Sequence, residues 1–320
     1  MSELATNRSQ ALHAIGFLMD PYESLNLKTE TSLLCMEELL IRGHRVYWIE
    51  QSRISLVNGI VCGQSGWVKS TAPFMLDQMA AMDIKDLDAL VIRKDPPFDQ
   101  SYLHLTYLLD FLPKEVIQIN PPAALRNFNE KLFTLNYPDI CPHSLVSKEL
   151  SDLMAFADQF KKIVLKPLND CSGRGIEFVQ ANQADLALTI GAMLAEYEYL
   201  LAQEFLPGIQ NGDKRVYLVN GEPVGWVNRV PKTGSDLANI HQGASCEATE
   251  LTPVELEICR TVGPDLVKEH ILLAGLDFID ERLTEINITS PSAVRQINQF
   301  TRDKVEIKIV NAILSKLDIP

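Results

Sequence analysis

The sequence predicts a protein of mixed α/β structure that is divided into more than one domain. In residues 14–119, short apolar runs alternate with helical patterns, as in an open sheet of parallel strands. The pair Pro121-Pro122 interrupts this alternation, because proline fits neither a strand ladder nor a helix interior. Beyond it, a glycine-containing turn at residues 169–175 and an Asn-Gly pair at residues 220–221 are typical of antiparallel hairpins. The architecture is therefore expected to change after the double proline.

The first region alternates predicted strands with predicted helices. Apolar runs predict the strands, and apolar side chains spaced three to four residues apart predict the helices. Asp20 and the run at residues 93–95 directly follow two of the strands, at the edge where open α/β sheets bind ligands. The predicted strands cover residues 14–19, 46–49, 89–92 and 116–119, and the predicted helices cover residues 31–42 and 102–111.

The middle region, up to Phe205, combines predicted helices with strands that pair as hairpins. The run at residues 163–165 ends in Lys166-Pro167, and a turn with Gly173 and Gly175 leads into the next apolar run. A strand follows this turn, so we expect a hairpin rather than a phosphate-binding loop that opens a helix. The predicted helices cover residues 126–132, 149–160 and 185–197, and the predicted strands cover residues 163–165, 176–179 and 199–205.

The last third contains two predicted hairpins and one unpatterned segment. The Asn-Gly pair joins strands at residues 215–219 and 223–228. Residues 230–250 show no periodicity, and a stretch of that length within a compact domain is often a lid over a functional site. Further predicted elements are a helix at residues 253–269, strands at residues 273–279 and 283–288, and a helix at residues 304–317.

Composition and charge exclude several classes of protein. Of the 320 residues, 46% are hydrophobic and 22% are charged, which is typical of an ordered globular chain. The net charge of -13 repels phosphate backbones and anionic lipids, so neither nucleic acid nor a membrane is an expected partner. The six cysteines form no CxxC pair, and the chain starts with no export signal, so we expect a reducing cytoplasm.

Three oxygen-bearing side chains lie close together in the predicted hairpin near the C-terminus. Glu285 and Asn287 are two residues apart, so in a strand they point the same way, and the hairpin places Asp277 alongside. Few carboxylates, completed by water and phosphate oxygens, suit Mg²⁺ bound to a nucleotide. The alternative is that these are solvated strand residues. Asp and Asn are poor strand formers that interrupt apolar runs here, which counts against that interpretation without excluding it.

A second group of candidate residues is basic: Lys131, Lys166 and Arg215. A lysine at the end of an apolar strand can reach a nucleotide phosphate, although a lysine there also serves to protect a sheet edge. The turn with Gly173 and Gly175 can cover phosphate oxygens with backbone N–H groups, or it can be a simple tight hairpin. The chain contains neither a P-loop motif nor GxGxxG.

Several strings, in this order along the chain, resemble bacterial glutathione synthetase, a member of the ATP-grasp ligase family. They are MDP at residues 19–21, RKDPPFD at 93–99, NEKLF at 129–133, GDKRV at 212–216 and TEINITSP at 284–291. The resemblance implies an ATP-grasp fold with three parts. These are an N-terminal open α/β (pre-ATP-grasp) domain at residues 1–122, a small lid domain at residues 123–205, and a C-terminal α+β catalytic domain at residues 206–320.

The resemblance also implies the reaction. ATP phosphorylates the C-terminal carboxylate of γ-glutamylcysteine, and the amine of glycine then displaces phosphate. The implied cofactors are ATP and Mg²⁺, with Mn²⁺ as the alternative ion. The implied partners are these small-molecule substrates, and we expect a homo-oligomer.

By resemblance, individual residues receive expected roles. Catalysis is assigned to Lys166 and Arg215, and metal binding to Asp277, Glu285 and Asn287. The peptide substrate is assigned to Arg215, Arg229, Ser290 and Arg295. ATP is assigned to Lys131, Lys166, Gly173, Gly175, Gln203, Glu204, Phe205, Leu206, Asp213 and Lys214.

The segment at residues 230–250 departs from the family pattern. The family carries a flexible loop with two arginines there, and this chain has Leu237 and Ser245 in their places. Two alternatives to glutathione synthesis therefore stay open. One is a divergent ligase with a different amino acid or γ-glutamyl substrate, and the other is a weakly active ATP-binding paralogue.

Overall fold

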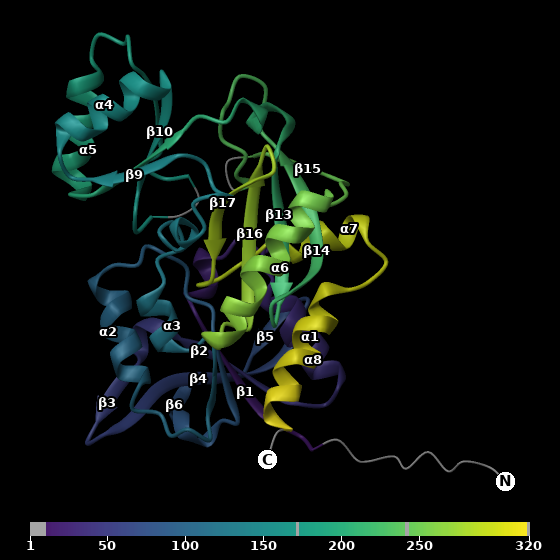
Figure 1. The fold of residues 1–320 in the computed structure, drawn as a ribbon. Helices are drawn as coiled ribbons and strands as arrows, with labels where there is room; N and C mark the ends of the chain where they lie inside the picture. Colours follow the sequence, from purple (N-terminus) through teal and green to yellow (C-terminus); the bar gives the residue numbers. More distant parts are fainter. Residues whose placement is uncertain (1–10, 171–172, 241–242, 319–320) are drawn as a thin grey trace.

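The computed structural model describes residues 11–170, 173–240 and 243–318. Its strands form three sheets, which follow one another along the chain at residues 14–119, 144–204 and 213–287 (Figure 1). Helices pack on each of them, so the predicted α/β class is confirmed.

The first sheet has a parallel centre. β1 (Ala14–Met19) pairs in parallel with β2 (Arg45–Glu50) and with β7 (Ala89–Ile92), and β7 pairs in parallel with β8 (Ile117–Ile119). All six residues of β1 are buried, which explains its continuous apolar sequence. The helices α1 (Ser32–Ile41) and α2 (Gln100–Leu109) complete the predicted strand–helix alternation.

An antiparallel extension of this sheet was not predicted. It consists of β3 (Ser55–Val57), β4 (Ile60–Thr71), β5 (Phe74–Leu76) and β6 (Ala80–Asp83). The long strand β4 contains Gly63 and Gly66, which weaken its strand pattern. The turn before it, Asn58-Gly59, has positive φ at both residues, so the Asn-Gly signal that identified residues 220–221 also marks this hairpin.

The second sheet is small, antiparallel and has a core of its own. Its order is β11-β10-β12-β9, built from β9 (Ser144–Ser147), β10 (Lys162–Pro167), β11 (Glu177–Gln180) and β12 (Leu200–Glu204). The helices α4 (Leu150–Phe160) and α5 (Leu186–Tyr197) pack against it and against each other. The pairing of β10 with β11 confirms that the glycine-containing turn joins a hairpin.

The predicted helix at residues 126–132 is wrong in position. The helix α3 covers Pro122–Asn127, with Pro122 as its first residue and Pro121 as the N-cap. Proline at the first helical position lacks only an N–H group that would have no helical partner there. The double proline therefore starts a helix rather than only separating two regions. A short 3₁₀ turn, η4 (Phe133–Asn136), follows.

The third sheet has the order β15-β14-β13-β16-β17. The Asn-Gly hairpin and the C-terminal hairpin are confirmed. The former joins β13 (Asp213–Val219) to β14 (Glu222–Val230), and the latter joins β16 (Leu273–Ile279) to β17 (Arg282–Asn287). The remaining elements are the 3₁₀ helix η5 (Pro207–Asn211), the strand β15 (Ser245–Glu247) and the helices α6 (Pro253–Lys268), α7 (Val294–Phe300) and α8 (Val305–Leu317).

The segment at residues 230–250 is partly regular, contrary to its unpatterned sequence. β15 lies within it and pairs with the end of β14, Ser245 opposite Val230. A three-residue strand is too short to produce a readable alternation. Residues 241 and 242, which belong to the predicted lid, lie outside the described residues.

The first and third sheets pack together, whereas the second stands apart. Two hydrophobic clusters each combine residues of the first sheet with residues of the third, while the second sheet's cluster draws on residues 153–202 alone. In Figure 1 the small sheet with α4 and α5 accordingly projects from the larger body. Within the described part of the chain, no helix is long and apolar enough to cross a bilayer.

Candidate active site

A cleft lies between the second and third sheets and is bordered by loops of the first region. β10, β11 and β12 contribute one wall, and β13, β14, β16 and β17 contribute the other. Two further segments, Asp95-Pro96 and residues 289–293, also line it. Of the residues with expected roles, the cleft is lined by Lys131, Lys166, Gly173, Gln203, Glu204, Phe205, Leu206, Asp213, Arg215, Arg229, Asp277, Glu285, Asn287 and Ser290.

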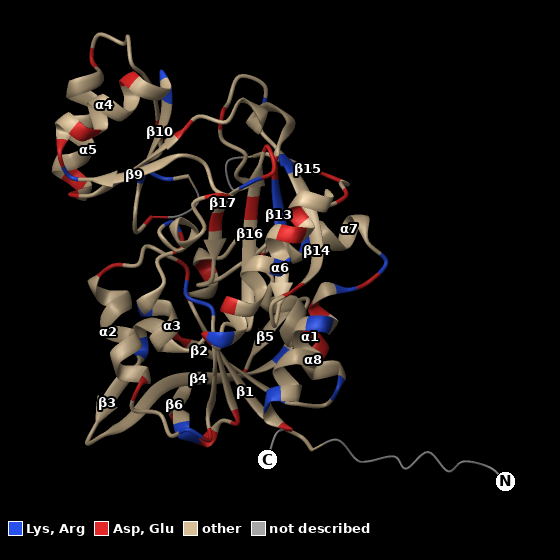
Figure 2. Ribbon diagram, in the orientation of Figure 1, with Lys and Arg blue, Asp and Glu red and all other residues tan. Residues whose placement is uncertain are grey.

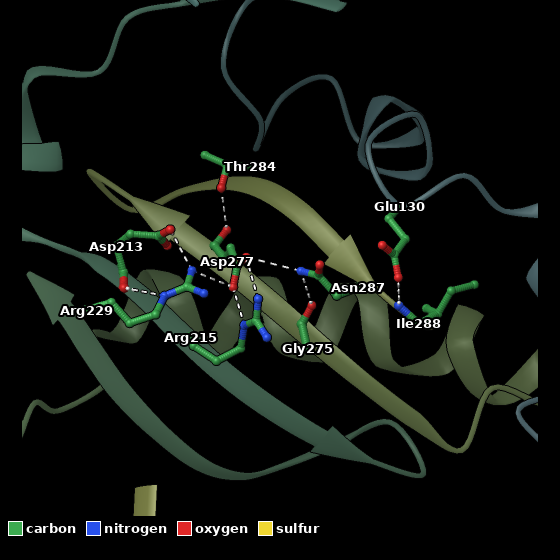
Figure 3. A network of polar contacts seen from close by, with 9 residues as sticks. All are labelled: Glu130, Asp213, Arg215, Arg229, Gly275, Asp277, Thr284, Asn287 and Ile288. Atoms are coloured by element: carbon green, nitrogen blue, oxygen red, sulfur yellow. Dashed lines mark hydrogen bonds and ion pairs between the residues drawn. The ribbon is translucent and has the colours of Figure 1, made fainter. Parts of the chain in front are cut away.

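The register of β16 and β17 brings the three oxygen-bearing side chains together. Asp277 lies opposite Glu285, and Gly275 lies opposite Asn287. The Asn287 Nδ2 atom donates to Asp277 Oδ2 over 3.1 Å and to the Gly275 carbonyl over 3.3 Å (Figure 3). Sequence alternation predicted this shared face, and the structure has it.

Two arginines hold Asp277 from the neighbouring strands. Arg215 on β13 donates Nε to Asp277 Oδ1 over 2.5 Å and a terminal nitrogen to Oδ2 over 2.8 Å. Arg229 on β14 lies 3.0 Å from Asp277 Oδ1 and 2.5 Å from Asp213 Oδ2. These two arginines and two aspartates are all largely buried, and Figure 3 shows them as one network across the sheet. Figure 2 shows the same pattern as acidic bands on β16 and β17 beside a basic band on β13.

The network gives its two aspartates different acidities. Burial opposes ionisation of Asp277, but the guanidinium groups of Arg215 and Arg229 outweigh it and lower its pKa. Burial raises the pKa of Asp213, and Arg229 opposes that shift only in part. Burial also disfavours the charge of Arg229, yet Asp213 and Asp277 together raise its pKa. Arg229 therefore stays charged inside the cleft, and both guanidinium groups offer N–H donors to a substrate anion.

The donor set fits a hard divalent ion in part. Glu285 lines the cleft, and its carboxylate forms no hydrogen bond within the described residues. Asn287 uses its Nδ2 as a donor, which leaves its side-chain oxygen as an acceptor. Asp277 differs, because both of its oxygens already accept from arginines. No group of three His, Cys, Asp or Glu side chains in the described ranges forms a metal site, so a metal here needs phosphate or water as further ligands.

The two lysines lie on the side of the cleft toward the second sheet. Burial lowers the pKa of Lys166, and the carboxylate of Glu285 opposes that shift. The Lys131 ammonium donates to the backbone carbonyl of Asp170, in the glycine-containing turn. Gly175 in that turn has a φ of +65°, and a Cβ there would lie 2.7 Å from Pro167 Cγ. Glycine is therefore required for this turn to fold back over β10.

The segment expected to bind adenine comprises the last two residues of β12 and the two residues that follow it. The buried Gln203 donates Nε2 to Ser144 Oγ over 3.1 Å, and the Glu204 carboxylate accepts from the His143 N–H over 3.0 Å. These bonds fix the backbone from which Phe205 and Leu206 line the cleft. Apolar side chains of Val164, Ile176 and Phe178 line the same wall. The result is a slot with apolar sides, suited to a flat ring.

Glu130 fixes the strand end that leads to Ser290, a role that sequence reasoning missed. Its Oε1 accepts from the Ile288 N–H over 2.7 Å and from the Thr289 N–H and hydroxyl, each over 2.8 Å. Ser290 in turn donates its hydroxyl to Asp95. Both acids lie in strings that carried the family resemblance, which is the signal that could have identified them.

Arg93, at the start of the RKDPPFD string, anchors Pro291, the residue that follows Ser290. Its guanidinium donates to the Pro291 carbonyl over 2.9 Å and to Ser32 Oγ over 3.0 Å. The first region thus positions Ser290 and Pro291, which line the cleft.

Three residues with expected roles do not line the cleft: Gly175 in the glycine-containing turn, Lys214 and Arg295. Lys214 sits between Asp213 and Arg215 on β13, so its side chain points to the opposite face, where Nζ lies 2.6 Å from Glu255 Oε2. Arg295, on α7, donates Nε to the Glu30 carbonyl over 3.0 Å.

The two positions where the family has lid arginines differ in their relation to the cleft. Leu237 lines it together with Asp236 and residues 238–240. Ser245 is exposed, lies on β15 and does not line it. Sequence comparison treats the two positions alike, but only the first faces the site.

The chain is similar to a known family over almost its whole length. The profile of the prokaryotic glutathione synthetase N-terminal domain matches residues 14–126, and that of the prokaryotic glutathione synthetase ATP-grasp domain matches residues 130–302. The glutathione synthetase of Coxiella burnetii is 37% identical over 297 residues, which cover 90% of this chain and 92% of the relative. That of Agrobacterium fabrum is 34% identical over 312 residues, covering 95% and 97%.

Solved structures share the fold at low sequence identity. A D-cycloserine synthetase has a TM-score of 0.69 at 11% identity, covering 95% of this chain and 100% of that one. The ATP-grasp ligase PsnB in complex with a minimal precursor has a TM-score of 0.63 at 18% identity, covering 96% and 99%. At these identities the similarity establishes the fold alone, and the predicted ATP-grasp fold is confirmed.

Proposed function

The chain belongs to the prokaryotic glutathione synthetase family, and we propose that it joins γ-glutamylcysteine to glycine in an ATP-dependent reaction through an acyl phosphate. The observation that carries this proposal is the cleft itself. It places Lys166 on one wall and, on the other, the buried cations Arg215 and Arg229 beside the carboxylates of Asp277 and Glu285. A reaction that brings an anionic carboxylate onto a triphosphate requires such mixed charge in a water-poor site.

We propose that the two walls of the cleft divide the work between the substrates. Lys131 and Lys166 hold the phosphates, and residues 203–206 hold the adenine between apolar side chains. Arg215 and Arg229 hold the carboxylate that is phosphorylated, while Ser290 positions the peptide at the other end. Asp213 completes the nucleotide end, next to Arg229.

The arginines act mainly by orientation. Because Asp277 fixes Arg215 through two hydrogen bonds, the guanidinium is held in place before substrate arrives. Charge that develops on the transferred phosphoryl group then meets fixed donors rather than mobile water. We propose that Glu285 and Asn287, with Asp277, hold Mg²⁺ when it is bound. That ion would neutralise phosphate charge.

Other parts of the proposal follow from the family and from the chemistry. A substrate with a thiol and a reaction that consumes ATP suit the cytoplasm, where thiols stay reduced. We expect the protein to act as a homo-oligomer on small molecules. Domain limits are proposed at residues 1–122, 123–205 and 206–320.

A phosphate-release assay tests the proposal directly. The protein is incubated with ATP, Mg²⁺ and γ-glutamylcysteine, and glycine is compared with a panel of other amino acids. Phosphate release that requires both γ-glutamylcysteine and glycine, with glutathione detected by mass spectrometry, is the expected result. Release that prefers another amino acid would show a divergent ligase, and ATP binding without release would show a paralogue that has lost turnover.

A further inference from the structure

A network of side chains outside the catalytic cluster ties the segment at residues 231–240 to the nucleotide side of the cleft. Lys162 on β10 places Nζ 2.7 Å from Asp236 Oδ2. Gln210 in η5 donates Nε2 to the other oxygen, Asp236 Oδ1, over 2.7 Å. Asp236 is thus held from two sides, by an ion pair and by a neutral hydrogen bond.

The same lysine also contacts the segment expected to bind adenine. Its Nζ lies 3.4 Å from the centroid of the Phe205 ring, and the Phe205 N–H donates to the Lys162 carbonyl over 3.2 Å. A cation over an aromatic face is attracted to it. Lys162 therefore joins two parts of the cleft lining: Phe205 on one side and Asp236 on the other.

The local fold of the segment supports this attachment. The Leu237 N–H donates to Ser235 Oγ over 3.0 Å, which closes a tight turn at Asp236. Asp236 and residues 237–240 then line the cleft, and Ala238 is buried. The ion pair itself is half-buried, so it is less screened by solvent than an exposed pair.

We propose that Lys162 and Asp236 form a latch that holds residues 231–240 over the nucleotide end of the cleft, and that both are positioning residues for ATP. The proposal rests on the proposed function in taking ATP as the nucleotide. Opening the latch frees the lid segment and loosens Phe205 together. The latch should therefore affect how tightly ATP binds more than how fast bound ATP reacts.

A double-mutant cycle tests the latch. The variants are Lys162→Met, Asp236→Asn and the two combined, with Lys162→Arg as the conservative replacement that keeps the cation. ATP affinity is measured by calorimetry without acceptor, so that no turnover occurs. Each single variant should weaken ATP binding about three- to tenfold. The combined variant should be no weaker than the worse single one, because both remove the same interaction. Lys162→Arg should bind ATP within about twofold of the parent.

A matched control exists in the first sheet extension. Lys69 on β4 lies 2.8 Å from Asp77 and 3.2 Å from the centroid of the Trp67 ring, so it repeats the geometry of the latch away from the cleft. Lys69→Met and Asp77→Asn should leave ATP affinity at the parental value. A loss of affinity in these variants would mean that the effect reflects general stability.

Two further measurements separate the latch from a structural role and from the reaction. Deuterium uptake by residues 231–240 should rise in Lys162→Met and Asp236→Asn, and it should stay at the parental level in Lys162→Arg. In turnover assays, KM for ATP should rise while kcat at saturating ATP stays within about twofold. The latch would be overturned if both single variants kept the ATP affinity and the deuterium uptake of the parent. It would also be overturned if the combined variant lost ATP affinity by the product of the two single losses. If the cycle behaves as expected but no glutathione forms, the substrate assignment fails and the latch stands.

Discussion

Asp277 and Asp213 are the same residue type on adjacent strands, and their surroundings shift their pKa values in opposite directions. Asp277 lies between two guanidinium groups, which lower its pKa despite its burial. Asp213 pairs directly with Arg229, but burial, helped by the nearby charge of Asp277, prevails and its pKa is raised. The ionised Asp277 is the fixed point that aims Arg215 into the cleft. The sequence identifies both residues as acidic but does not distinguish their states.

Glu285 differs from Asp277 in having no hydrogen-bond partner within the described residues, which makes it the freest carboxylate of the proposed metal set. Replacing Glu285 by Gln should lower turnover by about a hundredfold or more, because it removes a charged ligand from the metal site. Thermal unfolding should change little. Glu281→Gln, an exposed change in the turn of the same hairpin, is the control. Normal turnover in the Glu285 variant would place the metal elsewhere.

Because of Lys166, the affinity for ATP should decrease at alkaline pH. Burial lowers its pKa, so the ammonium loses its proton at a lower pH than an ordinary lysine does. The protonated form attracts phosphate, and ATP affinity should therefore fall as the pH rises toward the ordinary lysine range. In Lys166→Arg the guanidinium stays charged, so the fall should move to higher pH. Calorimetric titration across this range checks it, and identical profiles for both proteins would contradict the role.

Among the elements, those with strong periodicity or a clear turn signal were predictable. The central strands of the first sheet, α6, α8 and the two hairpins near the C-terminus agree with the sequence to within a few residues. The short strands β9 and β15 were missed, because three or four residues carry no period. The helix α7 was also missed, since seven residues span only two turns.

The candidate site was predictable where alternation along one strand determines which way a side chain points. It was not predictable where packing between distant residues determines the contact. Spacing placed Glu285 and Asn287 on one face, and the register of β16 and β17 supports this. The same alternation argues against Lys214 in the cleft, although it was assigned there by resemblance. The pairing of Lys162 with Asp236 joins residues 74 positions apart, and no local pattern reports such a contact.

The resemblance gives Leu237 and Ser245 the same importance in the lid segment, whereas the structure places only Leu237 at the cleft, and this difference can be tested. Leu237 lines the cleft, so Leu237→Arg would add a cation near the proposed acyl phosphate and should raise glycine-dependent turnover by about tenfold. Ser245 is exposed on β15, so Ser245→Arg should change turnover by less than about twofold. Phosphate release with glycine measures both. No rise in the first variant, with faster turnover of another amino acid by the parent, would indicate a changed acceptor.

Across the whole molecule, the first and third sheets behave as one packed body that carries one wall of the cleft. They share two hydrophobic clusters, and α1 and α8 pack against each other although they lie near opposite ends of the chain. The small sheet supplies the other wall from a separate cluster. The position of Lys166, which we propose binds phosphate, relative to the arginines therefore depends on how the small sheet is held on this body.

One buried side chain joins the first region to the third sheet through four hydrogen bonds. Asn120 is only 2% exposed, and its Nδ2 donates to the Leu273 and Ile288 carbonyls, each over 2.7 Å. Its Oδ1 accepts from the Leu272 N–H over 2.9 Å and from the Leu273 N–H over 3.0 Å. An amide is suited to this place, because it offers two donors and two acceptors without a charge. The ends of β16 and β17 are both fixed in this way.

Asn120→Ala should therefore lower the free energy of unfolding by about 2–4 kcal/mol, because it leaves several buried backbone groups without partners. Gln118→Ala on β8 is the matched control, since Gln118 donates a single hydrogen bond, to the Leu109 carbonyl over 3.2 Å. It should cost no more than about 1 kcal/mol. Urea unfolding of both variants measures the difference. Equal losses would mean that the two regions are held by their shared apolar cores alone. A larger loss in Asn120→Ala, with weaker binding of γ-glutamylcysteine by the folded variant, would show that this junction also positions residues 288–291.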